Sequence, residues 1–127
     1  MRVFLTKGVV KFTRQERISA GSLREAVDRA NRGLVDADLG GSLIKQRVAR
    51  PGQGRSGGFR MIVAIRTATR AVILYGFAKS DRENIEHDDL GALQTIGLNW
   101  LAADERSISQ AINDGTLKEI DYDDEKS

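Results

Sequence analysis

The chain has 127 residues, of which 40% are hydrophobic and 30% charged, proportions typical of one folded domain rather than of a disordered segment. It contains no cysteine and one histidine, which excludes disulfides and thiolate metal sites and argues against a zinc site built by the protein. No apolar run approaches the ~20 residues of a membrane-spanning helix. We therefore expect a single cytoplasmic domain over residues 1–127, with no membrane contact, metal or cofactor.

Charge is distributed unevenly along the chain. Residues 1–82 contain 17 Lys and Arg against 6 Asp and Glu, whereas residues 83–127 contain 3 against 12. A basic body of this kind favours an anionic partner. A solvated surface whose two halves offset each other explains the same numbers, so charge alone leaves both interpretations open.

The first predicted elements are a strand and two helices. Residues Arg2–Thr6 favour a strand, and apolar spacing predicts a helix over Lys7–Ile18. Ser22 and Glu25 form a capping-box pattern at the start of a second helix, which ends near Gly33. The first helix carries four cations at helical spacing: Lys7, Lys11, Arg14 and Arg17. Such a stripe is either a solvent-facing surface or an RNA-binding face that contacts phosphates.

Three strands follow a segment with the composition of a turn, Asp36–Ser42. They are predicted over Leu43–Ala49, Phe59–Arg66 and Ala71–Phe77. The third is apolar on both faces, which is typical of a strand in the middle of a sheet. Its tyrosine, Tyr75, is therefore expected in the core.

Basic residues lie within and beside these strands. Lys45 and Arg47 are two residues apart, so a strand places both on one face. If the strands are neighbours, five cations converge on a patch suited to a polyanion: Lys45, Arg47, Arg60, Lys79 and Arg82.

The connection over Arg50–Gly58 contains the only proline and four of the thirteen glycines. It lacks the Gly-Lys-Ser/Thr sequence that leads into a helix in nucleotide-binding phosphate loops. It is either a flexible hairpin connection or a mobile basic loop that closes over an RNA backbone through Arg50 and Arg55.

The remaining chain predicts a helix from Asp88 or Asp89, a short helix near Ser107 and a last strand over Leu117–Tyr122. The acidic end, residues 121–127, is expected to be frayed. The fold class is α+β, with a small, mainly antiparallel sheet made of a three-strand meander and the N-terminal strand. An N-terminal helical hairpin packs on this sheet, and helices follow it.

In order and spacing, these elements resemble the RelE/HigB-type toxins of bacterial type II toxin–antitoxin pairs over roughly residues 2–103. The matching residues are Lys45-x-Arg47, Gly58-Phe59-Arg60 and the segment Tyr75–Arg82. The resemblance implies an endoribonuclease that cleaves messenger RNA, usually in the ribosomal decoding site. It also implies a cognate antitoxin that holds the enzyme inactive and through which operator DNA is contacted.

The resemblance assigns the family's basic strand pair to Lys45 and Arg47, its sheet arginine to Arg60, and its last basic cluster to Lys79 and Arg82. Several members place a tyrosine, and others a histidine, near the start of the last helix as a proton-transfer group. Here that neighbourhood is Ile85-Glu86-His87, without a tyrosine.

The residues suit metal-independent cleavage, in which the 2′-OH of the substrate attacks the adjacent phosphate. Arginines match the oxygens of the charged phosphorane, and a lysine crowded by cations, Lys45, can serve as the base. His87 is the candidate acid for the leaving 5′-oxygen, although a lone histidine between two acidic residues is also typical of a helix cap.

Two other classes remain open. A non-catalytic RNA-binding module would use the same basic face and need neither acid nor base. A basic interaction protein would use it for an acidic protein partner. Single substitutions separate these classes, because an enzyme can lose cleavage while it retains binding.

Overall fold

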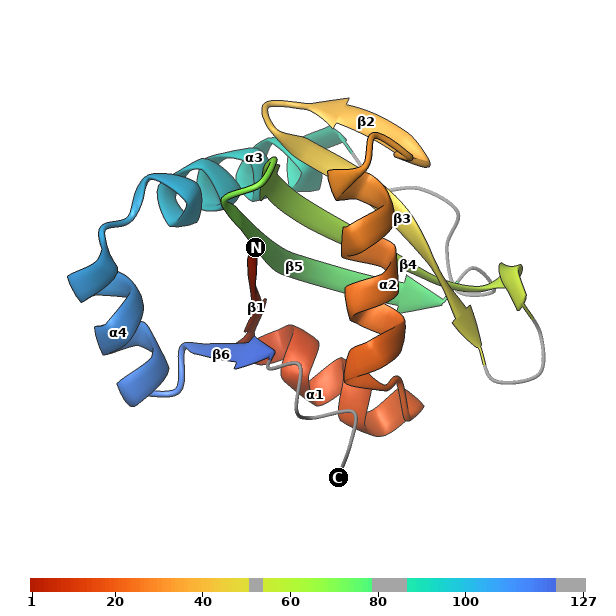
Figure 1. The fold of residues 1–127 in the computed structure, drawn as a ribbon, viewed down its shortest axis with the longest axis horizontal. Coiled ribbons are helices and arrows are strands. Elements are labelled where there is room, and N and C mark those ends of the chain that lie inside the picture. Colours follow the sequence, from red (N-terminus) through yellow and green to blue (C-terminus); the bar gives the residue numbers. More distant parts are fainter. Residues whose placement is uncertain (51–53, 79–86, 121–127) are drawn as a thin grey trace.

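The computed structural model describes residues 1–50, 54–78 and 87–120 (Figure 1). Along the chain the elements are β1 (Arg2–Thr6), α1 (Lys7–Glu16), α2 (Ala20–Asn31), β2 (Ala37–Gly40), β3 (Leu43–Arg50), β4 (Gly54–Arg66), β5 (Arg70–Ala78), α3 (His87–Ala102), α4 (Glu105–Asn113) and β6 (Leu117–Ile120). The structure is α+β, as predicted.

One mostly antiparallel sheet organises the molecule. Its strands are ordered β2-β3-β4-β5-β1-β6, and β1 runs parallel to β5 while the other neighbours are antiparallel. The predicted meander is β3–β4–β5. The N-terminal strand pairs with β5 on the side away from β4, so β5 lies inside the sheet, as its apolar sequence predicted.

Helices cover both faces of the sheet (Figure 1). On one face, Val9 of α1 and Val27 of α2 pack in a cluster that includes Ile73 of β5. On the other, Leu101 of α3 and Ile108 of α4 pack in a second cluster. Because both faces are buried, β4 and β5 are apolar at successive positions rather than at alternate ones.

Two local predictions were wrong. The segment read as turn material forms β2, in which Ala37 pairs with Lys45 and Asp38 with Ile44. Its residues are of types common in turns, but their backbone groups form hydrogen bonds with β3, and this pairing decides the structure. The cap of α2 is Ser19 rather than Ser22, since the Ser19 hydroxyl accepts the amide hydrogen of Ser22 at 3.1 Å.

The loop predicted between β3 and β4 is shorter than expected. The strands extend to Arg50 and from Gly54, and these two residues pair across the hairpin. A long irregular loop would leave backbone groups unpaired that the extended ladder satisfies. Lys79, Arg82 and the acidic end over 121–127 lie outside the described residues.

The last strand, β6, is held to β1 by side chains as well as by its ladder. Arg2 contacts Glu119 at 2.9 Å and Glu105 at 2.7 Å. From the opposite face, Arg24 donates to the carbonyl of Ile120 at 2.9 Å. The hydrogen bond from Arg2 lowers the pKa of Glu119 below its ordinary value. None of the helices in the described ranges is long and apolar enough to cross a membrane.

Candidate nucleic-acid interface

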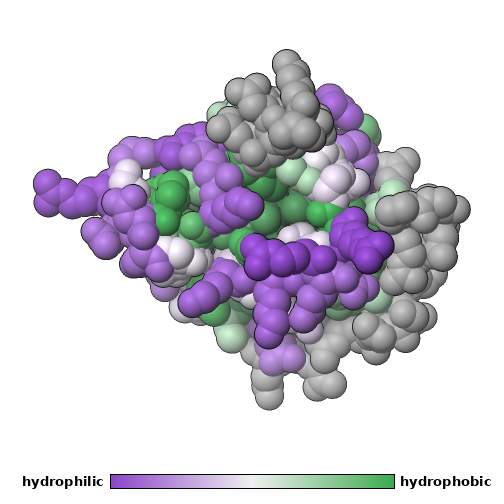
Figure 2. Space-filling model, turned by 90° about the horizontal axis from the view of Figure 1, so that it is seen from below, coloured by the Kyte–Doolittle hydropathy of each residue, from purple (hydrophilic) through white to green (hydrophobic). Residues whose placement is uncertain are grey.

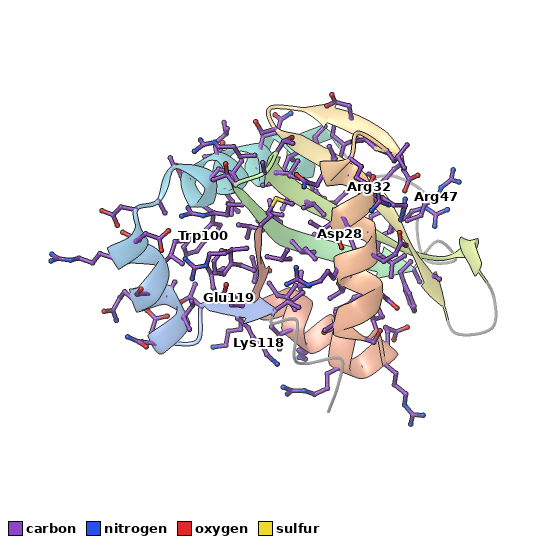
Figure 3. The ribbon with its side chains drawn as sticks, viewed as in Figure 1. Asp28, Arg32, Arg47, Trp100, Lys118 and Glu119 are labelled. Carbon is purple, nitrogen blue, oxygen red and sulfur yellow. The ribbon has the colours of Figure 1, made fainter. Side chains whose placement is uncertain are left out.

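The register of β3, β4 and β5 arranges the basic residues in two rows across one face of the sheet. Arg47 pairs with Arg60, which pairs in turn with Phe77. Lys45 lies one row further along the same face of β3. The prediction that Lys45 and Arg47 share a face is confirmed, and the residue between them, Gln46, is fully buried on the other face. Arg47 projects from β3 at the end of the molecule away from α4 (Figure 3).

Arg47 and Arg60 form a cross-strand pair of like charges. Arg47 is exposed, whereas only 7% of Arg60 is accessible. Burial lowers the pKa of Arg60 from its ordinary value, and the charge of Arg47 lowers it further, while Asp36 acts in the opposite direction. An arginine remains protonated in spite of such a shift, so two positive charges face each other across neighbouring strands. An anion bound between them would relieve this repulsion.

The backbone of Arg47 is held by two side chains, which we call the Arg47 clamp: Arg29 and Asp36. The Arg47 amide donates to Asp36 Oδ2 at 2.7 Å, and its carbonyl accepts from Arg29 Nη2 at 2.5 Å. The clamp residues contact each other, with Arg29 Nη1 at 3.1 Å from Asp36 Oδ2. β2 starts at Ala37, which pairs with Lys45. The clamp binds the backbone of β3 just beyond that pair, where β2 provides no further residue.

The clamp is partly buried and charged. Arg29 has a side chain that is 7% accessible and also contacts Glu25 at 2.6 Å. Burial by itself would raise the pKa of Asp36, but the Arg47 amide and the Arg29 guanidinium donate to it, and the net result is a lowered pKa. The carboxylate therefore stays ionised beside the two arginines.

Gln46 anchors the opposite face of β3. Its side-chain nitrogen donates to the carbonyls of Ala26 at 2.9 Å and Leu34 at 3.2 Å, and its oxygen accepts from the Asp36 amide at 2.7 Å. A buried amide with all these partners is costly to displace. The strand that carries Lys45 and Arg47 is thus fixed to α2 on the face opposite to these two cations.

Tyr75 does not lie in the core, which corrects the prediction. The pairing of β5 shifts between Ile62 and Val63, because Val63 is opposite Ile73 and Ile62 is opposite Tyr75. Leu74 is the extra residue of a bulge, and a bulge re-aims the side chains that follow it. With regular alternation Tyr75 would share the buried face of Ile73. Instead it is 36% accessible and lies in the row of Lys45.

The cationic stripe on α1 lies on the opposite side of the sheet from Arg47 and Arg60, because Val9 of α1 packs in the other core cluster. Figure 2 views the molecule from the side of α1 and shows hydrophilic side chains around a strip of hydrophobic ones. The four stripe residues are exposed: Lys7, Lys11, Arg14 and Arg17. One RNA segment can contact both basic surfaces only by passing around the edge of the sheet.

The other predicted residues are only partly placed. His87 is the first residue of α3, whereas Arg50 ends β3 and Arg55 belongs to β4. The side chains of these three residues, and all of Lys79 and Arg82, lie outside the described part of the chain. Within that part, no three His, Asp or Glu side chains come together as a metal-ion site.

Comparison with known proteins identifies a family for the chain. The family model described as RelE toxin of RelE / RelB toxin-antitoxin system matches residues 1–120. That range includes all described strands and helices. No individual curated protein matches the chain.

Proposed function

The chain belongs to the RelE toxin family and is therefore the toxin of a toxin–antitoxin pair, with a cognate antitoxin as partner; from this premise we propose that it is a metal-independent endoribonuclease that cleaves messenger RNA on the ribosome. The observation that carries the proposal is the cross-strand pair of Arg47 and Arg60 beside Lys45. Three cations on one face match a phosphate that gains charge during cleavage.

The proposed reaction begins with the 2′-OH of the substrate, which attacks the adjacent phosphate. Lys45 is the proposed acceptor of its proton, because it lies beside the arginine pair on the same face of the sheet. Arg47 and Arg60 bind the phosphorane oxygens with their planar guanidinium groups. The 5′-oxygen then leaves with a proton, for which His87 is the candidate donor.

The remaining cations are proposed to bind RNA without taking part in the chemistry. Lys79 and Arg82 follow β5 along the chain, and Arg50 and Arg55 flank the β3–β4 turn. The stripe on α1 is proposed to contact a separate stretch of the ribosome–message complex, since it lies on the opposite face of the sheet. Such phosphate contacts add affinity that falls with rising salt.

Induced expression tests the proposal directly. We expect growth arrest, and new 5′ ends in cellular messenger RNA that appear within translated regions. Co-expression of the cognate antitoxin should restore growth. Intact messenger RNA in cells that contain the folded protein would overturn the nuclease assignment.

The same experiment distinguishes a non-catalytic RNA-binding module, which the lack of a tyrosine before α3 favours. Such a module would bind RNA with similar affinity and produce no new 5′ ends. Substitution of Arg60 would then weaken binding in parallel with any effect on growth. An enzyme would instead lose cleavage more than affinity.

His87→Gln tests the proposed proton donor. If His87 protonates the leaving oxygen, the variant should cleave at least tenfold more slowly with unchanged RNA affinity. The rate of the wild type should fall as pH rises through about 6–7, the usual range for histidine, and the variant should lack this step. An unchanged rate and pH profile would assign the donor to Lys79, Arg82 or water.

A further inference from the structure

A hollow of about 500 Å³ lies between α1 and the exposed edge of β5. It is lined by Gly8, Val9 and Phe12 of α1 and by residues 74–77 of β5. The hollow exists because β1 is short. Its pairing with β5 ends at Leu5 and Ile73, after which the chain turns into α1 and leaves the next part of the edge without a neighbouring strand from β1.

Three of the seven residues that line the hollow are aromatic: Phe12, Tyr75 and Phe77. The rings of Tyr75 and Phe77 lie 5.9 Å apart, tilted by 34°. Phe12 is held edge-on against Phe59, with ring centroids 5.7 Å apart. At Gly76 a Cβ would come within 2.9 Å of the Phe12 ring and within 2.7 Å of Met61 Sδ, so the glycine permits α1 to approach the strand this closely.

The hollow lies at an edge of the sheet and is lined from both faces, by α1 on one face and by Phe77 on the face of the two arginines. Phe77, one of its lining residues, is the direct cross-strand neighbour of Arg60, and Arg60 is the neighbour of Arg47. Adjacent strands lie about 4.8 Å apart. β5 is therefore one strand from Arg60 and two strands from Arg47, so a ligand with an anionic group at Arg60 reaches the hollow with a planar group roughly 5–10 Å away. A nucleotide has this arrangement of phosphate and base.

We propose that the hollow binds a nucleobase of the RNA whose phosphate lies at Arg47 and Arg60. The proposal rests on the proposed function and adds a base-binding subsite to it. Aromatic side chains stack on any base, because every base has a π-face. The volume falls in the range of pockets that accept small ligands. The subsite holds the nucleotide in place and discriminates only weakly among bases.

Gly8 offers a way to fill the hollow without disturbing the fold. It lies within α1, lines the hollow, and a Cβ added to it meets nothing within 4 Å. Gly8→Leu is designed to occupy part of the hollow with a side chain, and it raises the helix propensity of α1. Gly91→Leu is the matched control, since Gly91 of α3 also has open space at its Cβ and does not line the hollow.

The experiment measures binding of a short single-stranded RNA that carries a 2′-deoxy sugar at the cleavage position and so stays intact. We expect Gly8→Leu to bind roughly tenfold more weakly than the wild type, the effect of one lost stacked base. Gly91→Leu and Gly8→Ala should bind like the wild type. Tyr75→Ala, which removes a lining ring from the other side, should weaken binding in the same direction.

A series of RNAs with one abasic nucleotide at each position in turn identifies the base. One abasic position should weaken wild-type binding by about the same factor as Gly8→Leu. In the Gly8→Leu variant the same abasic RNA should cause no further loss, because both changes remove one contact. Equal binding of Gly8→Leu and the wild type, or additive losses with every abasic RNA, would overturn the proposal.

The outcome for the wild type separates this proposal from the proposed function. A wild-type protein that cleaves RNA while Gly8→Leu binds and cleaves equally well overturns only the base subsite. A wild-type protein that neither binds the short RNA nor cleaves message on the ribosome overturns the nuclease assignment. If Gly8→Leu weakens the cognate antitoxin and leaves RNA binding unchanged, the hollow is a protein contact and the proposal is wrong.

Discussion

Replacing Arg60 with methionine is expected to lower the cleavage rate by roughly a hundredfold, the usual effect of removing one contact to a charged transition state. The fold should lose little stability, although the hydrogen bond from Arg60 Nη1 to the Phe59 carbonyl at 3.3 Å is lost. Arg60 is buried opposite Arg47, and both its desolvation and that charge oppose its protonated form. A methionine of similar length removes both costs and keeps the packing.

The neighbouring strand pair, β4 and β5, provides a matched control, Arg70→Met. Arg70 is also buried and also faces an arginine across the strand pair, Arg66. Arg60 donates to the Phe59 carbonyl at 3.3 Å, whereas Arg70 makes shorter bonds to the carbonyls of Trp100 and Ala103, both at 2.8 Å. Its loss should destabilise the fold by about 2–3 kcal/mol and leave cleavage by the folded fraction unchanged.

Both variants are compared by denaturant unfolding and by single-turnover cleavage of ribosome-bound message. The expected pattern is an active Arg70→Met that is clearly destabilised, and an inactive Arg60→Met whose stability is closer to that of the wild type. If Arg60→Met instead loses stability and keeps its cleavage rate, Arg60 is a structural residue and the assignment of the phosphate site fails.

Removing the Arg47 clamp is expected to have the largest effect on stability. Arg29→Leu leaves the Asp36 carboxylate and the Arg47 carbonyl without their buried partner. Loss of one member of a fully buried charged pair costs about 3–5 kcal/mol, and we expect roughly 2–4 kcal/mol here because Asp36 is partly exposed. Because the clamp holds the backbone of Arg47, the variant should also cleave more slowly, with a larger effect on kcat than on KM.

Arg24→Leu is the control for this variant. Arg24 and Arg29 belong to the same helix, α2, and each is 6% accessible. Arg24, however, donates to the Ile120 carbonyl in β6, which is separated from β3 by three strands. Both variants should be less stable, but only Arg29→Leu should cleave slowly at temperatures where the protein is folded. Equal cleavage by the two would show that the clamp supports the fold alone.

The clamp also predicts how stability depends on pH. The pKa of Asp36 is lower in the folded protein than its ordinary value of 3.8. The unfolded chain therefore binds this proton more readily, and the contribution of Asp36 is complete above about pH 5 and is lost as pH falls through the folded pKa. Acid titration of the free energy of unfolding should be steeper for the wild type than for Asp36→Asn. Parallel curves would contradict the lowered pKa.

Much of the fold follows from local sequence patterns. Short apolar runs bounded by turn residues predicted the strands of the meander, and the two-residue period of a strand predicted the shared face of Lys45 and Arg47. Helical spacing predicted the helices on both sides of the meander. These patterns are local, so they can be recognised without knowing which elements pack against each other. The boundaries of α2 and of the β3–β4 hairpin were less accurate, because caps and ladder ends depend on which neighbouring groups accept the hydrogen bonds.

The amino-acid sequence by itself determined the α+β class, the basic body of the chain, and the residues that one strand presents on one face. Only the tertiary structure decided which of these residues meet. The pairing of Arg47 with Arg60 depends on the register between strands, and the Arg47 clamp joins a helix, a loop and a strand that are distant in the sequence. The bulge at Leu74 turns Tyr75 out of the core, and the early end of β1 opens the hollow beside it. Each of these is set by long-range pairing, which no local periodicity encodes.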